Sequence, residues 1–199
     1  MDNQTPGEIL SKFYADNYLA ADGGQSSSSV KIVLAGNFII YYPNFNARRK
    51  AVLKHDIHHI LTEYNTDLSG ESEICAWEIA SGCKGYWAAF FIDTSGIMIG
   101  FLFNYWGVLK AFARGRKTKN LYHDMFTDEK VVDFTVSELR SKLNLDKFSK
   151  NTKPAFTDFI LLNLFAVYGA IYSIILLVLL PYFIFYSIYI SLKTKKVSQ

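Results

Sequence analysis

The chain has 199 residues, of which half are apolar, and its formal net charge is +3. This length suits one domain of ordinary size with a short appendage. The small charge and the lack of any nucleic-acid-reading motif argue against a nucleic-acid partner. The N-terminal residues carry neither a basic, apolar signal nor an Arg-rich transit pattern, so we expect a bacterial protein that is not exported by a cleaved signal.

The first predicted element is a helix that begins after Thr5. Thr5 can cap it, Pro6 suits its first turn, and Glu8 stands three residues after the cap, which completes a capping box. Its apolar face is predicted to extend as far as the glycine pair at 23–24. The next apolar segment, residues 30–42, is either a strand or a helix, because neither its length nor its residue types decide between them.

The centre of the chain has the spacing of successive helices. We predict one over residues 47–63 with Asn46 as its cap, a second over 71–91, a polar turn at 93–96, and a third helix that ends near residue 113. A second capping box, Thr135 with Glu138, opens a short helix that ends at Leu143. The predicted fold is an all-α domain over residues 1–150, followed by a hydrophobic membrane segment.

The third helix carries small residues on one face, namely Gly96, Gly100, Asn104 and Gly107. Such a face lets another chain approach the backbone closely. It is either a groove for a lipid tail or the contact of one helix with another. A membrane span is disfavoured here, because Asp93 and Asn104 interrupt the apolar run.

Cys75 and Cys83 are the only cysteines, and they stand eight residues apart in an apolar helical pattern. A thiolate zinc site needs further cysteines, which the chain lacks. We therefore expect two buried free thiols in a reducing compartment, not a disulfide.

No charged residue occurs from Phe159 to Leu192. As a helix this stretch would extend about 50 Å, beyond the roughly 30 Å of bilayer hydrocarbon. Gly169 and Pro181 are the candidate bend points. We predict a membrane segment over residues 156–192, and its form, one transmembrane span or a re-entrant hairpin, stays open.

The segment His55-Asp56-Ile57-His58-His59 is the candidate site. In a helix, His55 and His59 stand four apart on one face, so their ring nitrogens can reach one ion at about 2.0–2.1 Å each. Asp56 lies beside them, and a turn after His59 can return Glu71 to the same ion. We therefore predict a divalent metal held by His55, Asp56, His59 and Glu71.

Known metal motifs fit this segment poorly. A zincin protease needs Glu where Asp56 stands, and a His-Asp phosphohydrolase needs a further histidine upstream. Mixed nitrogen and oxygen ligands suit zinc, which is our first expectation, and also iron or manganese.

The run from His55 to Tyr64, continued through Gly70-Glu71, resembles the signature of the coenzyme Q (ubiquinone) biosynthesis protein 4 family. The later segments 113–117, 136–140 and 143–145 resemble that family's closing segment. The resemblance covers roughly residues 5–146, and the hydrophobic tail is not part of that family domain.

This resemblance implies an all-helical, membrane-peripheral domain that accommodates a polyprenyl tail. It implies oxidative decarboxylation of a polyprenylated quinone precursor, in which a hydroxyl replaces the carboxylate at ring carbon C1, with Asp56 and His59 as the catalytic candidates. The expected location is the cytoplasmic face of a bacterial inner membrane. The alternative is a non-catalytic, lipid-binding scaffold that gathers other quinone-biosynthesis enzymes. A homodimer stays open in either case.

Overall fold

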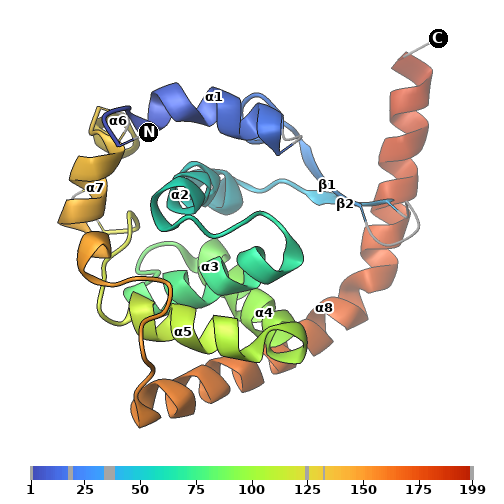
Figure 1. Ribbon diagram of the computed structural model, residues 1–199. Helices are drawn as coiled ribbons and strands as arrows, with labels where there is room; N and C mark the ends of the chain where they lie inside the picture. Colours follow the sequence, from blue (N-terminus) through green and yellow to red (C-terminus); the bar gives the residue numbers. More distant parts are fainter. Residues whose placement is uncertain (1, 18–19, 34–38, 124–125, 132, 198–199) are drawn as a thin grey trace.

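The computed structural model describes residues 2–17, 20–33, 39–123, 126–131 and 133–197. These residues are mostly helical, with little strand, which confirms the all-α prediction (Figure 1). The elements are, in order, α1 Pro6–Asp16, β1 Ser29–Val33, β2 Ile39–Pro43, α2 Asn46–Thr62, α3 Leu68–Ser81, α4 Trp87–Phe103, α5 Tyr105–Gly115, α6 Asp128–Val131, α7 Val136–Lys142, the 3-10 turn η2 Leu145–Lys147 and α8 Phe156–Val197.

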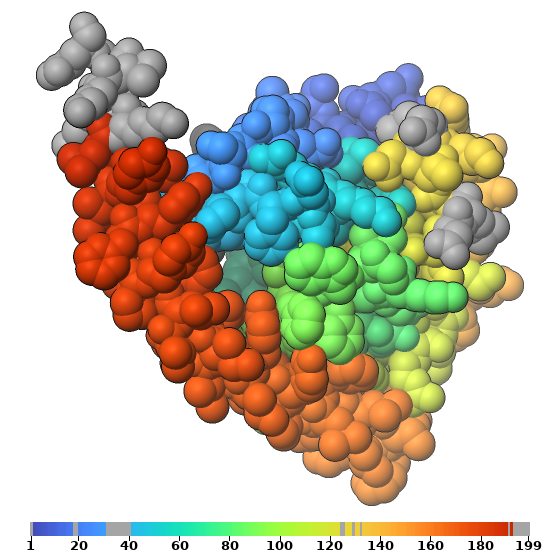
Figure 2. Space-filling view, turned by 180° about the vertical axis from the view of Figure 1, so that it is seen from behind, coloured from blue at the N-terminus to red at the C-terminus, as the bar shows by residue number. Residues whose placement is uncertain are grey.

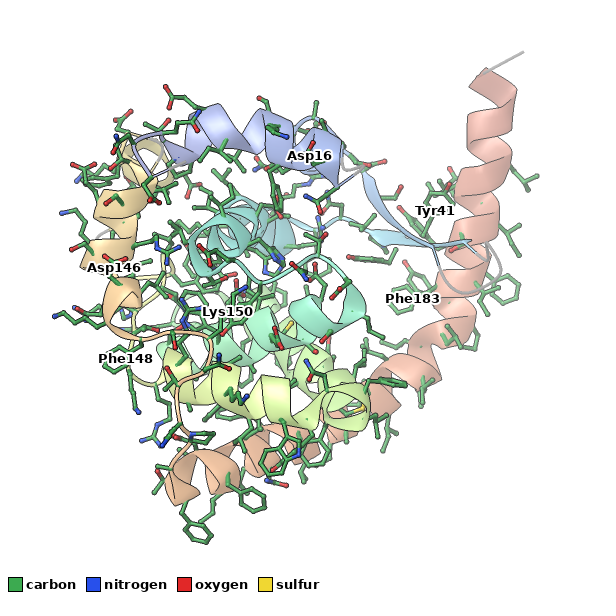
Figure 3. The ribbon with its side chains drawn as sticks, viewed as in Figure 1. Asp16, Tyr41, Asp146, Phe148, Lys150 and Phe183 are labelled. Carbon is green, nitrogen blue, oxygen red and sulfur yellow. The ribbon has the colours of Figure 1, made fainter. Side chains whose placement is uncertain are left out.

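The apolar segment of undecided structure forms an antiparallel pair of strands. Ser29 of β1 faces Pro43 of β2, and Val33 faces Ile39. The strands reach across to α8, where the Ser187 hydroxyl accepts a hydrogen bond of 2.8 Å from the backbone N–H of Tyr41. Figure 3 shows the side of β2 that carries Tyr41 lying against the stretch of α8 labelled at Phe183.

Both predicted capping boxes are present. The Thr5 side chain accepts from the N–H of Glu8 while the Glu8 carboxylate accepts from the N–H of Thr5, and Thr135 and Glu138 repeat this exchange in α7. The helix after Thr5 is shorter than predicted and ends at Asp16. These caps are set by residues three apart, so tertiary packing is not needed to form them.

Two predictions at the start of the central region need correction. Asn46 is not the cap of α2 but its first residue; Phe45 holds the cap position and makes no side-chain cap bond. The predicted helix over 71–91 is two helices, because Gly82 and Gly85 adopt positive φ angles of 108° and 80° between α3 and α4. Glycine tolerates this left-handed region, which other residues rarely adopt.

The polar turn predicted at 93–96 is wrong, since these residues lie inside α4. The Asp93 and Thr94 side chains are buried, and the Thr94 hydroxyl donates to the carbonyl of Phe91, so their polarity is satisfied without leaving the helix. The third predicted helix instead breaks at Asn104, whose side chain accepts from the N–H of Gly107 and caps α5.

The glycine face of α4 contacts α3 and is not a lipid groove. A Cβ at Gly96 would collide with the Cys75 side chain, and one at Gly100 would collide with Ser72 and with Val108 of α5. The helix-packing alternative is therefore the right one for these glycines. Helix α3 lies at the centre of the domain, and its Trp77 is the largest fully buried side chain among the described residues.

The tail forms one continuous helix of 42 residues, α8, and not a re-entrant hairpin. Its first half runs beneath α5 and α4, and its second half turns along the side of the domain past the strands (Figures 1 and 2). Leu162 is fully buried against the domain, and a Cβ at Gly169 would collide with the carbonyl of Thr94. From Phe156 to Ile190 the helix is long and apolar enough to cross a membrane.

Candidate metal centre

Three of the four predicted metal ligands converge on one point between α2 and α3. The Nε2 atoms of His55 and His59 are 3.3 Å apart. The Glu71 carboxylate approaches both rings, with Oε1 at 3.3 Å from the Nε2 of His59 and Oε2 at 3.5 Å from the Nε2 of His55. The helical spacing of His55 and His59 and the turn that returns Glu71 produce the arrangement that the sequence predicted.

The other nitrogen of each ring is already engaged. Nδ1 of His59 donates to the carbonyl oxygen of Tyr64 at 3.0 Å, and Nδ1 of His55 donates to Oε1 of Glu78 at 3.0 Å. A carbonyl and a carboxylate oxygen can only accept, so both protons sit on Nδ1. In the neutral rings, both Nε2 atoms then present lone pairs toward each other and toward the Glu71 carboxylate.

This donor set fits a divalent metal ion. Two ligand nitrogens at 2.0–2.1 Å from a tetrahedral zinc ion lie about 3.3–3.4 Å apart, which matches the separation of the two Nε2 atoms. Lone pairs and a carboxylate that meet at one point repel one another unless a proton or a metal ion lies between them. Histidines that bind metals in proteins donate their second N–H to a carboxylate or backbone carbonyl, as both rings do here.

The electrostatics of the site favour a positive charge at this point. Burial acts to lower the pKa of His55, but the negative charges of Glu78 and Glu71 outweigh it and raise this pKa well above its usual value. Burial acts to raise the pKa of Glu71, but its hydrogen bonds with His55 and His59 lower it to about 2. The carboxylates therefore stay ionised and available as ligands.

The structure does not bring Asp56 into this group. Its carboxylate lies beside the hydroxyl of Tyr14 and next to Gly23, and its Oδ2 is buried without a hydrogen bond of ordinary geometry in the described residues. Burial raises the pKa of Asp56 above its usual value. Its predicted roles as a ligand and as a catalytic residue remain predictions.

The sequence did not single out Glu78 or Asp93, which lie behind His55. Glu78 is fully buried and Asp93 almost so, and together with His55 they form a second group able to hold a cation. Glu78 follows Glu71 by seven residues, two helical turns, so the 3.6-residue period of α3 was the available signal. Asp93 comes from another helix, and no local pattern connects it to the site.

Both cysteines are free, as predicted. The Sγ of Cys83 lies 3.6 Å from Oδ2 of Asp93, and burial and this carboxylate raise the pKa of the Cys83 thiol. Burial likewise raises the pKa of Cys75. Protonated thiols are poor metal ligands, so these residues do not form a thiolate site.

A pocket of about 510 Å³ opens beside His59, between α1 and the turn that follows α2. Its wall includes the rings of Phe13 and Tyr64 together with polar side chains, and the Phe13 ring stacks on His59 at 6.0 Å between centroids. His59 is thus shared by the centre and the pocket, whereas His55 and Glu71 are not among the residues that line the pocket.

Comparison of the chain with protein-family models, with curated proteins and with solved structures gave no significant match. The family resemblance of the His55–Glu71 segment therefore stays a prediction.

Proposed function

We propose that this protein is a metal-dependent enzyme of ubiquinone biosynthesis. It would remove the carboxylate from a polyprenylated aromatic acid at a membrane surface and leave a hydroxyl in its place. The observation that supports this proposal is the convergence of His55, His59 and Glu71 on one point, with both ring protons held on the far nitrogens. The resemblance of this segment to the coenzyme Q biosynthesis protein 4 family supplies the substrate class.

In the proposed reaction the bond between the ring and the carboxylate breaks and carbon dioxide leaves. Water supplies the oxygen that bonds to the same ring carbon, and the two electrons pass to dioxygen, which takes up the released protons and leaves as hydrogen peroxide. A bound divalent ion supplies Lewis acidity toward the carboxylate and the adjacent phenolic oxygen. Phe13 and Tyr64 would orient the ring in the pocket beside His59.

The proposed location is the membrane, with the domain on the cytoplasmic face. Support comes from α8, whose outward side chains are apolar and largely exposed along its length, Leu164, Val167 and Ile171 among them. Basic residues flank the apolar stretch on both sides, Lys147, Lys150 and Lys153 before it and Lys193, Lys195 and Lys196 after it, so the positive-inside bias does not by itself select a side for the domain.

The test begins with the full chain purified in detergent and measured for bound zinc, iron and manganese. We expect a divalent ion in the wild type and its loss in His59→Ala and in Glu71→Ala. Glu73→Gln is the matched control, because Glu73 lies on the same helix but contacts Asn104 and not the histidines. Circular dichroism confirms that each variant is folded, and mass spectrometry identifies the lipid that copurifies.

Turnover assays then separate the two predicted roles. If the metal variants fold, bind their partners and block only the decarboxylation, the protein is the enzyme. If they abolish the assembly of every pathway enzyme, the scaffold role is right instead. Retention of metal and turnover by both variants rules out the site.

A further inference from the structure

We propose that the corner where α4 meets α5 rests in the headgroup region of a phospholipid bilayer. We call Leu102, Phe103 and Trp106 the apolar corner. Their side chains are 71%, 73% and 69% exposed, although each is large and apolar. Clustered exposed residues of this kind mark an interaction surface, whereas single ones do not. This inference rests on the proposed membrane association of α8.

The apolar corner is joined to the start of α8. The ring of Tyr105, between Phe103 and Trp106, packs against the ring of Phe159 with centroids 6.4 Å apart. Phe159 itself is 44% exposed and opens the charge-free stretch of the tail. The apolar corner therefore lies beside the residue at which the charge-free stretch of α8 begins.

The charges around the corner favour a lipid surface over a protein partner. Lys110 follows Trp106 by one helical turn, and Lys153 is exposed just before α8. The one acid at the start of α8, Asp158, is neutralised by a 2.8 Å ion pair with Arg116. Tryptophan bordered by lysine matches the headgroup region of an anionic bilayer, and the nearby Glu73 carboxylate accepts a hydrogen bond from the Asn104 side chain.

The three tryptophans of the chain make a direct test. Trp77 is fully buried, and Trp87 lies at the far end of α4, stacked on Phe45. The full-length Trp87→Phe variant emits from Trp77 and Trp106, whereas Trp87→Phe/Trp106→Phe emits from buried Trp77 alone. Both are placed in vesicles of phosphatidylcholine and phosphatidylglycerol, with or without bromine on the acyl chains.

We expect brominated lipid to quench most of the Trp106 emission and to leave the Trp77 emission nearly unchanged. If the protein floats with the vesicles but Trp106 is not quenched, the corner does not touch lipid and this proposal is wrong. Protection of Trp106 together with cross-linked dimers would assign the corner to a second copy and also overturn it. Failure to float at all refutes the membrane association of α8 instead.

A separate observation concerns the buried carboxylate behind the metal centre. We infer that Glu78 is a positioning residue that holds the rings of His55 and His58 with the proton on Nδ1, which leaves the Nε2 of His55 free to bind the metal. Its Oε1 accepts from the Nδ1 of His55 at 3.0 Å and from the Nδ1 of His58 at 2.6 Å, and its Oε2 accepts from the Tyr122 hydroxyl at 3.0 Å. This inference rests on the proposed metal site.

His55 and His58 both direct Nδ1 to Glu78, but their Nε2 atoms have different partners. The Nε2 of His58 accepts from the backbone N–H of Leu121 at 2.9 Å, so both of its nitrogens are used. The Nε2 of His55 faces His59 and Glu71. Because Glu78 holds both rings with the proton on Nδ1, each Nε2 carries a lone pair. The lone pair of His55 points to the metal centre, and that of His58 accepts from the backbone N–H of Leu121.

Glu78→Gln tests this role. A glutamine oxygen can still face both rings, as Oε1 does now, but the amide is neutral and its NH2 group cannot accept from the Tyr122 hydroxyl, so the bonds that hold the two rings lose their charge assistance. We expect its affinity for Zn²⁺, measured by competition with a chromophoric chelator, to fall by about 10–100-fold. The Glu73→Gln variant is again the control, and its affinity should match the wild type.

A measurement on the wild type keeps the inference open to refutation if Glu78→Gln fails to fold. Nitrogen-15 NMR of labelled histidines in the zinc-loaded wild type should show His55 and His58 protonated on Nδ1 alone, the tautomer that free histidine favours less. Protonation on Nε2, or Zn²⁺ affinity unchanged in Glu78→Gln, contradicts the inference. Two zinc ions per chain would also contradict it, since Glu78 would then be a ligand. A wild type that binds no zinc, iron or manganese refutes the metal site itself.

Discussion

The contact between Gly96 and Cys75 tests whether α3 and α4 pack as tightly as the metal centre requires. A Cβ at Gly96 would overlap the Sγ of Cys75 and lie 3.0 Å from its Cβ. Overpacking of this kind costs about 1–3 kcal/mol, and the better helix propensity of alanine offsets about 0.5–1 kcal/mol of it. We expect Gly96→Ala to lower the free energy of unfolding by about 1–2 kcal/mol.

The closest atom in this clash is a sulfur that can be removed. In the double variant Gly96→Ala/Cys75→Ala the new methyl group takes the place of the Sγ, so its destabilisation should be smaller than the sum of the two single effects by about 1–3 kcal/mol. Thermal unfolding in detergent measures this, at about 2–4 °C for each kcal/mol. Ser95→Ala is the control, because the Ser95 side chain bonds only within α4.

Zinc affinity provides the second readout of the same variants. Glu71 lies one helical turn before Cys75 on α3, so a displaced α3 moves this carboxylate away from the histidines. We expect zinc affinity to fall in Gly96→Ala and to return in the double variant. If the destabilisation of the double variant equals the sum of the two single effects, α3 and α4 are not in tight contact here.

Three further predictions concern single features. Thr135→Ala removes the capping box of α7 and should lower the free energy of unfolding by about 0.5–2 kcal/mol, seen as a lower melting temperature. Asp158→Asn weakens the buried ion pair with Arg116 at the start of α8, so this junction should be cleaved faster in limited proteolysis, and an unchanged cleavage rate would argue against it. The raised pKa of each thiol keeps Cys75 and Cys83 protonated at pH 8, so iodoacetamide should label them only after denaturation; rapid labelling of the native chain would contradict this.

The sequence predicted the features that depend on near neighbours in the chain. The capping box of Thr5 and Glu8 links residues three apart, and the ligand pair of His55 and His59 links residues four apart. Such contacts follow from the helical period alone. The apolar tail was likewise evident from composition, because a long charge-free run is a local property.

The helix boundaries in the centre of the chain were predicted wrongly for a physical reason. Asp93 is polar, and polar residues beside glycine normally mark a turn. Its burial near Glu78 and Cys83 keeps it inside α4, and this burial comes from packing between helices. The predicted helix over 71–91 instead breaks at Gly82 and Gly85, which have positive φ angles. The apolar pattern around these glycines had favoured a continuous helix.

The sequence by itself determined that the chain forms amphipathic helices, that His55, His59 and Glu71 can meet, and that its tail is apolar. Only the tertiary structure decided which histidine has a free nitrogen, because the partners of His58 include a backbone N–H at Leu121, 63 residues away. It also placed Asp56 against α1 and not at the centre. Contacts between residues so far apart arise when helices pack, and no short-range pattern encodes them.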